Sequence, residues 1–229
     1  MKELKKLKIL SIIPARSGSK SIKNKNIILY KGKPLIYHTI KASLNSRYIN
    51  KVLVSTDSTK YQKIAKNFGA EAPFLRPKNI SHNNSHDKDL VMHALKFYLK
   101  ENYFPDLIIF LRPTTPNRTP RVIDNAIQYF YKNIKKFDSM RSVSKVNQPP
   151  QKLFQLKGKT LIGFFDGILK GEYHSLPRQK FSQALLPNGY VDILKPTFFY
   201  RKKNILFGKK ILAYFTERTL DIDVKEDLK

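Results

Sequence analysis

The chain of 229 residues contains no cysteine, which excludes disulfide bonds and metal sites built from thiolates. This absence fits a reducing compartment, and we expect a cytoplasmic protein. No apolar stretch approaches the ~20 residues of a membrane span, and the apolar run at residues 9–13 is too short for a signal-peptide core. We therefore expect one domain over residues 1–229, with no membrane span.

Acidic residues are scarce: 17 Asp and Glu stand against 44 Lys and Arg, which gives a formal net charge of +27. Such a balance is one sign of a polyanionic partner. The basic residues are spread along the whole chain, however, and no RNP, zinc-finger or helix-turn-helix pattern accompanies them. We expect no specific nucleic-acid partner, although weak, nonspecific binding at low salt is compatible with this charge.

Apolar runs alternate with amphipathic segments over the first 131 residues. The runs predict buried strands at residues 9–13, 51–54 and 107–111. Helical periodicity and end signals predict helices at residues 34–44, 59–68, 87–99 and 119–131. This alternation indicates an α/β fold: a three-layer, doubly wound, mostly parallel sheet whose ligand lies beyond the carboxyl ends of the strands.

The pattern changes after residue 138. Strands are predicted at residues 139–146, 190–200 and 211–215. Between the first two of them, residues 154–165 are β-like and turn-rich, and residues 173–186 are irregular. We expect a protruding, β-rich arm over about residues 145–187, within the same domain.

A polar, cationic loop follows the first predicted strand, with Arg16, Gly18 and Lys20 among its residues. α/β proteins hold phosphates at such a place, because successive backbone N–H groups cradle the anion. Gly18 would let the backbone approach closely, and Arg16 and Lys20 would supply charge. The loop matches neither the Walker A nor the GxGxxG pattern. A solvated basic turn is the alternative.

Seven short segments carry a more specific signal. They are IPARSGSK (residues 13–20 with Ile12 before them) followed by Lys25-Asn26, Val54-Ser55-Thr56-Asp57, Leu75-Arg76-Pro77, LRPTTPNR (residues 111–118), Pro177-Arg178-Gln179, Pro187-Asn188-Gly189 and Asp221-Ile222-Asp223. Together they resemble, in the same order, the motifs of the sugar-acid cytidylyltransferases, the family of CMP-N-acylneuraminate synthetases. The resemblance spans nearly the whole chain.

The resemblance implies an enzyme that joins CTP to an acidic sugar of the nonulosonate (sialic-acid-like) type, releasing pyrophosphate, for surface glycan synthesis. It implies Mg²⁺ as cofactor, a nucleotide-diphospho-sugar transferase-like fold, and a homodimer in which the arm reaches the partner's active site. Two rival interpretations are a nucleotide-sugar glycosyltransferase and a catalytically inactive nucleotide-binding module of the same fold.

The same resemblance distributes roles among residues. The nucleotide-binding set is Ala15, Arg16, Ser17, Gly18, Ser19, Lys20, Lys25, Asn26 and Arg76. The sugar-binding set is Arg112, Thr114, Thr115, Arg178, Gln179 and Asn188. The catalytic set is Arg16, Lys20, Asp221 and Asp223. For Lys25, Arg76 and Arg178, a solvated or structural cation is the alternative, and Asp57 is either a helix cap or an active-site residue.

Asp221 and Asp223 stand two residues apart near the end of the chain. Alternate residues of an extended backbone face the same side, so both carboxylates can meet one hard cation such as Mg²⁺. Many surface loops contain such a pair, but acids are scarce here and apolar Ile222 separates the two. The five histidines show no metal-binding spacing, and we expect His38 and His93 to be packing residues.

Several positions depart from the family's pattern: Ser17 and Ser21 replace glycines, Arg112 replaces a glutamine, Leu186 replaces a basic residue, and Asp192 replaces an apolar or aromatic one. The departures gather on the sugar side. A buried arginine at position 112 must find an anion, either on the substrate or in a carboxylate such as Asp192. We expect the preferred sugar to differ from N-acetylneuraminate.

Overall fold

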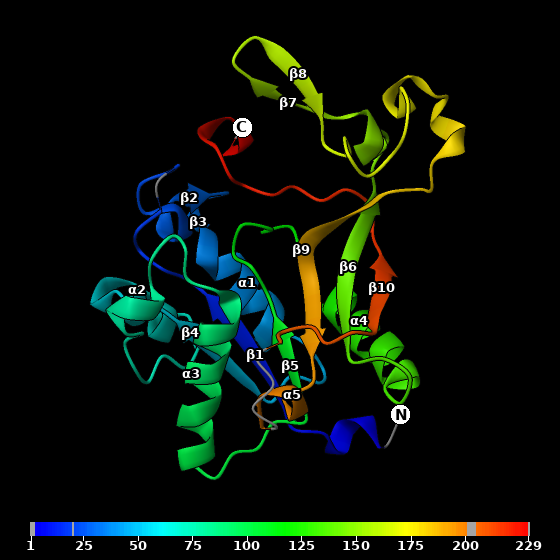
Figure 1. The fold of residues 1–229 in the computed structure, drawn as a ribbon. Coiled ribbons are helices and arrows are strands. Elements are labelled where there is room, and N and C mark those ends of the chain that lie inside the picture. Colours follow the sequence, from blue (N-terminus) through cyan, green and yellow to red (C-terminus); the bar gives the residue numbers. More distant parts are fainter. Residues whose placement is uncertain (1–2, 20, 201–204, 229) are drawn as a thin grey trace.

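A computed structural model describes residues 3–19, 21–200 and 205–228 (Figure 1). Its core is a six-stranded sheet in the order β10-β6-β9-β5-β1-β4. Strands β1 (Ile9–Pro14), β4 (Lys51–Ser55) and β5 (Leu107–Phe110) pair in parallel, as their continuous apolar runs predict. The predicted mostly parallel α/β sheet is confirmed.

The other half of the sheet is mixed. Strand β9 (Leu185–Leu194) runs antiparallel to both of its neighbours, β5 and β6 (Ser139–Lys145). Strand β10 (Ile211–Phe215) pairs in parallel with β6. β9 is therefore the one reversed strand of this sheet in the described part of the chain.

Helices cover both faces of the sheet. On one face, α1 (Leu35–Leu44), α2 (Thr59–Asn67) and α4 (Pro120–Asn133) pack on the odd-numbered side chains of β1. On the other face, α3 (Asp87–Lys100) packs against Leu10 and Ile12, with α5 (Thr197–Tyr200) beside it. The predicted helices are confirmed, as is the cap of α4, where the Thr119 side chain accepts a hydrogen bond from the Val122 backbone N–H.

The predicted strand at residues 190–200 is wrong in both of its bounds. Pro196 cannot donate to a strand ladder, and the chain leaves the sheet after Leu194 to form the short helix α5. At its other end, β9 begins five residues earlier, at Leu185, and pairs with the end of β6 beyond a register shift. Gly189, with φ of +63°, lies inside this strand, and its presence makes the sequence here look like a turn.

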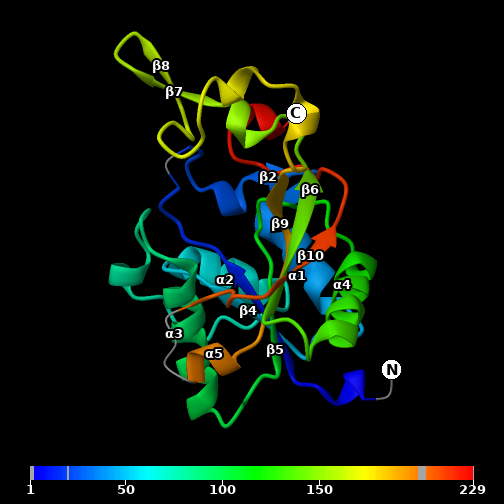
Figure 2. The same cartoon turned by 45° about the vertical axis from the view of Figure 1, so that its right-hand side comes forward.

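The expected arm lies beyond the carboxyl ends of the parallel strands, and Figures 1 and 2 show it projecting from the sheet near the carboxyl terminus. It contains one antiparallel hairpin of β7 (Phe154–Lys157) and β8 (Thr160–Gly163). The rest is turns and short 3₁₀ helices at Pro150–Lys152, Tyr173–Ser175 and Arg178–Lys180. The arm is therefore less rich in strands than expected.

The remaining elements are small. Strands β2 (Leu29–Tyr30) and β3 (Lys33–Pro34) form a two-residue hairpin ahead of α1. Short 3₁₀ helices occupy Leu4–Lys6, Lys25–Ile27, Lys78–Ile80 and Lys225–Leu228. Within the described residues, none of the helices has the length and apolar character needed to cross a membrane.

Candidate active site

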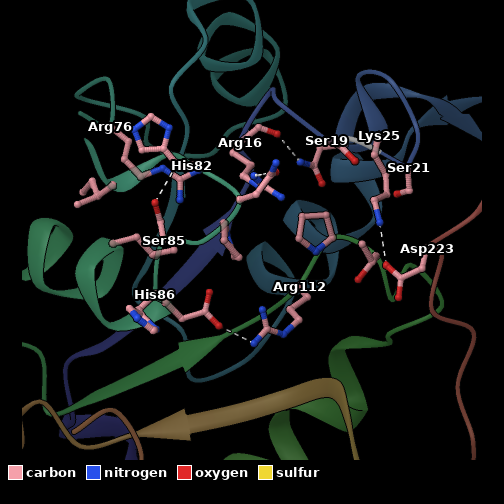
Figure 3. Close-up of a pocket in the computed structure, with 18 of the residues that line it drawn as sticks. Arg16, Ser19, Ser21, Lys25, Arg76, His82, Ser85, His86, Arg112 and Asp223 are labelled. Atoms are coloured by element: carbon pink, nitrogen blue, oxygen red, sulfur yellow. Dashed lines mark hydrogen bonds and ion pairs between the residues drawn. The ribbon is translucent and has the colours of Figure 1, made fainter. Parts of the chain in front are cut away.

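A cavity of about 650 Å³ opens beyond the carboxyl ends of β1 and β5, where the fold class predicts a ligand (Figure 3). Its walls come from the loop after β1, the segment before α3, the loop after β5 and the carboxy-terminal segment. The predicted site residues that line it are Arg16, Ser19, Lys25, Asn26, Arg76, Arg112, Thr114, Asp221 and Asp223.

Two arginines on one wall have no carboxylate in hydrogen-bond contact within the part of the chain that the structure describes. Arg16 donates from Nη1 to Asn83 Oδ1. Arg76 is 5% exposed, and its Nε and Nη2 have no hydrogen-bond partner among the described residues. Burial lowers the pKa of Arg76, although the nearby charge of Asp57 favours its cationic form. A buried guanidinium with unused donors at a cavity indicates an anionic ligand.

Asp57 anchors the loop that carries Arg16. The Ser17 backbone N–H donates to Asp57 Oδ1 at 2.8 Å, and Ser17 Oγ donates to Oδ2 at 3.2 Å. Asn26 Nδ2 donates to the Arg16 carbonyl at 2.9 Å. Ser58 rather than Asp57 caps helix α2, since its side chain accepts the Tyr61 N–H. Asp57 therefore fixes the shape of the loop after β1 and does not serve as the cap.

Asp221 and Asp223 both line the cavity, while Ile222 between them is fully buried. The Ile222 N–H donates to the Thr114 carbonyl at 2.8 Å, which docks this segment on the loop after β5. Lys25 Nζ donates to Asp223 Oδ1 at 2.8 Å (Figure 3). Burial raises the pKa of Asp221, and a hydrogen bond with the Thr114 side chain opposes that rise.

The two carboxylates suit one kind of metal better than another. Within the described residues, no group of three or more His, Asp or Glu side chains is arranged to hold a metal ion. Zn²⁺ is commonly held by three or four side chains of this kind, and the described residues do not offer such a group. Mg²⁺ is commonly held by one or two carboxylates, with water and substrate phosphates completing its shell, and the donor set fits that habit.

Arg112 is already paired within the protein. Its Nη2 donates to Asp87 Oδ2 at 2.7 Å, and its guanidinium lies 5.1 Å from the centre of the Phe110 ring. Burial alone would lower the pKa of Arg112, but the charge and hydrogen bond of Asp87 raise it overall. The expected alternative partner, Asp192, is fully buried and instead accepts a hydrogen bond from Arg141 Nε at 3.4 Å.

The other predicted site residues that the structure describes lie off the cavity. Ala15 and Thr115 are fully buried, and Ser17 and Gly18 are not among the described residues that line it. Asn188 Nδ2 donates to Thr216 Oγ1 at 2.7 Å. Within one chain, Arg178 and Gln179 line a separate hollow of about 310 Å³ in the arm. Lys20 falls outside the described residues.

One wall was missed by sequence reasoning. It consists of the polar segment that leads from Arg76 into helix α3, together with the first residues of that helix: Ile80, His82, Asn83, Ser85, His86, Asp87 and Leu90. A polar run between a motif arginine and a helix start was the available signal. His38 and His93 do pack against aromatic rings, as predicted.

Residues 10–167 match the family model described as Cytidylyltransferase. The chain is 34% identical over 222 residues to the N-acylneuraminate cytidylyltransferase of Escherichia coli O18:K1:H7, which covers 96% of this chain and 50% of that protein. It is also 34% identical over 224 residues to the pseudaminic acid cytidylyltransferase of Campylobacter jejuni strain 81-176, covering 97% and 94% of the two. The chain thus spans half the length of the first relative and nearly all of the second.

The fold is also found among solved structures. A CMP:2-keto-3-deoxy-manno-octonic acid synthetase complexed with CTP superposes with a TM-score of 0.69 at 16% identity, covering 96% of this chain and 95% of that one. A 4-diphosphocytidyl-2C-methyl-D-erythritol synthase superposes with a TM-score of 0.65 at 9% identity, covering 97% and 96%. At these identities the likeness concerns the fold.

Proposed function

The chain belongs to the cytidylyltransferase family, and we propose that it transfers CMP from CTP to a hydroxyl of a nonulosonate-type sugar acid, with release of pyrophosphate. The relatives named for N-acylneuraminate and pseudaminic acid support the substrate class. We place the reaction in the cytoplasm, which a chain without cysteine fits.

The observation that carries the proposal is that the guanidiniums of Arg16 and Arg76 line the same cavity as the two aspartates of the carboxy-terminal segment. Figure 3 shows Arg76 and Asp223 on opposite sides of this cavity. The unused donors of buried Arg76 call for an anion with several acceptor oxygens. A triphosphate provides them, and it also suits the loop after β1, where Ser19 lines the cavity.

The reaction then proceeds by in-line displacement. The sugar hydroxyl attacks the α-phosphorus and a new P–O bond forms, while the hydroxyl proton passes to solvent. The bond from the α-phosphorus to the bridging oxygen breaks, and its electron pair leaves on pyrophosphate. Negative charge grows on the leaving oxygens, and cations fixed in advance stabilise it without reorganisation. Arg16 and Arg76 hold that position, and Lys20 is predicted to add a third cation.

Asp221 and Asp223 are the residues that would hold Mg²⁺. When bound, the ion would neutralise phosphate charge and polarise the phosphoryl oxygens. Lys25 orients Asp223 through their 2.8 Å contact, and Thr114 orients the segment through the Ile222 N–H. These contacts keep both carboxylates at the cavity.

On the sugar side, we propose that Arg112 and Thr114 meet the acidic sugar. An arginine fork has five N–H donors, and Arg112 donates from Nη2 to Asp87, which fixes the guanidinium beside the cavity. Thr115 and Asn188 support the walls of the cavity instead of meeting the sugar. The Thr115 side chain bonds to the Arg112 carbonyl, and the Asn188 side chain bonds to Thr216.

We further propose a homodimer formed through the arm. Several large apolar side chains of the arm stand in solvent, among them Leu156, 71% exposed, and Ile168, 76% exposed. Leu156 stands opposite Leu161, 63% exposed, in the β7–β8 hairpin, and neighbouring exposed apolar side chains of this kind support an interaction site. In such a dimer, Arg178 and Gln179 would lie on the segment that approaches the partner's cavity.

Pyrophosphate release tests the function directly. The purified chain is assayed with each of the four ribonucleoside triphosphates and a panel of sugar acids, with and without Mg²⁺. We expect release only with CTP, a sugar acid and Mg²⁺ together. CTP binding without release under any of these conditions would identify an inactive nucleotide-binding module. A parallel incubation with nucleotide sugars tests the other rival, since transfer of their sugar would identify a glycosyltransferase.

A further inference from the structure

Strands β5 and β9 stop pairing and diverge at the edge of the cavity. Their ladder ends at the pair of Phe110 and Asp192. Beyond it, β9 bends at Gly189, whose φ is +63°, and β5 turns into the loop that starts at Arg112. The carbonyls of Arg112, Gly189 and Tyr190 thus lie past the ladder and need donors from elsewhere.

Arg118 donates to all three carbonyls, and the Thr115 hydroxyl adds bonds to those of Arg112 at 3.1 Å and Gly189 at 3.3 Å. Arg118, 4% exposed, donates from Nη2 to the carbonyls of Arg112 and Gly189, each at 3.1 Å. Its Nη2 also donates to Thr115 Oγ1, its Nε to the Tyr190 carbonyl, and its Nη1 to Thr39 Oγ1 at 3.1 Å. The guanidinium therefore ties the ends of both strands to helix α1.

This cation is buried at a cost. All of the hydrogen-bond acceptors that the described residues offer to it are neutral, and Asp192 and Asp221 act on it only through longer-range attraction. Burial lowers the pKa of Arg118 to about 9. A buried charge without a carboxylate partner is weak support for stability, so the geometry that it imposes is the more relevant property.

The groups that Arg118 fixes lead directly to the reaction site. Arg112 and Thr115 begin and end the loop whose Thr114 carbonyl accepts the Ile222 N–H between the two aspartates. Gly189 lies so close to Arg112 that an added Cβ would stand 2.9 Å from Arg112 Cδ. A shift of either strand end would move the Arg112 side chain or the aspartate segment.

We propose that Arg118 is a positioning residue of the transfer reaction: it locks the splayed ends of β5 and β9, and so places Arg112 and Asp221 without touching substrate. The inference rests on the proposed function. Arg16 and Arg76 lie on the opposite wall and are held by contacts with Asn83 and Thr56. Loss of Arg118 should thus impair turnover and sugar use, and leave CTP affinity nearly intact.

The test is Arg118→Lys, which keeps the charge but removes the fork. We expect kcat to fall on the order of 10²-fold, as for a displacement of about 1 Å in a reacting group, and the sugar KM to rise. The CTP dissociation constant, measured by calorimetry, should change by less than about threefold. Arg121→Lys, an exposed arginine at the start of helix α4 three residues further on, is the matched control and should match the wild type.

Normal turnover in Arg118→Lys would overturn the proposal, and so would equal losses in turnover and CTP affinity, which indicate a general structural role. If that variant does not fold, Thr39→Val decides. It removes one acceptor from Arg118 and should lower kcat by about tenfold with CTP affinity unchanged. Unchanged turnover in Thr39→Val would then refute the assignment.

Amide hydrogen exchange separates this inference from the proposed function. Arg118→Lys should speed exchange at residues 112–115 and 188–190, and leave residues 16–19 unaffected. If the wild type binds CTP but transfers CMP to no sugar acid, the proposed function fails. The exchange data still test whether Arg118 holds the ends of β5 and β9 in place. Unchanged exchange at both strand ends would refute it.

Discussion

The two walls of the cavity handle their cations differently. On the wall of Arg16 and Arg76, neither guanidinium is bonded to a carboxylate, and two donors of Arg76 are unused among the described residues. On the facing wall, Lys25 is bonded to Asp223 at 2.8 Å, and Arg112 is bonded at 2.7 Å to Asp87, which begins helix α3 on the side of Arg76. Acidic residues are scarce in this chain, with 17 Asp and Glu against 44 Lys and Arg. Their placement therefore separates cations that have a carboxylate partner from cations that have none.

The difference teaches where charge is to be bound and where it is to be held in place. Unpaired cations keep their full attraction for an incoming anion, whereas the charge of a paired cation is largely neutralised by its carboxylate neighbour. The first wall therefore suits the triphosphate of the proposed reaction. The second wall suits orientation of the carboxylates and selection of the sugar.

The largest effect is expected from Arg76→Met. Removal of a preorganised cation at the phosphates should cost on the order of 10²-fold or more in kcat/KM for CTP. The melting temperature should stay the same or rise, because the variant also removes a buried charge without a hydrogen-bonded partner. Calorimetric CTP titration and thermal unfolding measure both.

Arg112→Met is the matched control from the facing wall, and its CTP affinity should stay near that of the wild type. Equal losses of CTP affinity in the two variants would erase the distinction between the walls. An Arg76 variant with normal CTP affinity would remove the triphosphate from this side of the cavity.

A second prediction tests the role of Asp221 and Asp223 as ligands of Mg²⁺. In the Asp221→Asn, Asp223→Asn double variant the fold should persist, since the Ile222 backbone still docks on Thr114. Turnover should fall by about 10²-fold, and the Mg²⁺ concentration for half-maximal rate should rise. Glu217→Gln, an exposed acid on the same segment, is the control. A wild-type Mg²⁺ profile in the double variant would rule out the metal assignment.

A smaller effect is expected from Arg112→Gln, which exchanges a cationic fork for a neutral donor and acceptor. We expect the ratio of kcat/KM values between two sugar acids to shift by about tenfold, with little change in the CTP constant. Asp87→Asn tests the internal pair separately. If it reproduces the whole effect of Arg112→Gln, then Arg112 serves Asp87 and not the sugar. A selective rise in the CTP constant would also contradict the assignment.

Sequence reasoning succeeded where a local pattern determines the outcome. The apolar run of β1 and the polar loop after it place Arg16 at the carboxyl end of a parallel sheet, because crossover connections leave that end open. The period of two residues also placed Asp221 and Asp223 on the same side of buried Ile222. Such features depend on neighbours in the chain.

Features that depend on distant contacts were out of reach. The partner of Arg112 is Asp87, which lies 25 residues away on another element, and no local pattern selects it over Asp192. The start of β9 depends on pairing with β6 across a register shift. The network of Arg118 joins α1, β5 and β9, and LRPTTPNR alone does not reveal it.

The smallest predicted effect concerns His93, whose pKa depends on the charge of Arg76, the buried arginine of the first wall. His93 packs on Phe74, with ring centres 4.5 Å apart, and its Nδ1 has no hydrogen-bond partner among the described residues. Burial lowers the pKa of His93, and the charges of Arg76 and Lys96 lower it further. The folded protein thus binds this proton less readily than the unfolded chain, whose histidine titrates near 6.5.

The sign of the pH effect follows. The His93 contribution to stability is fully present above pH 6.5 and is lost as the pH falls through the lower pKa of the folded state. We expect His93→Phe to reduce the fall in melting temperature between pH 7 and pH 5 by about 1–3 °C. NMR titration of the His93 ring is the finer measurement: its pKa should rise in Arg76→Met and also when CTP neutralises Arg76. A His93 pKa that ignores both changes would show that Arg76 does not act on this ring, and that the anion is bound elsewhere.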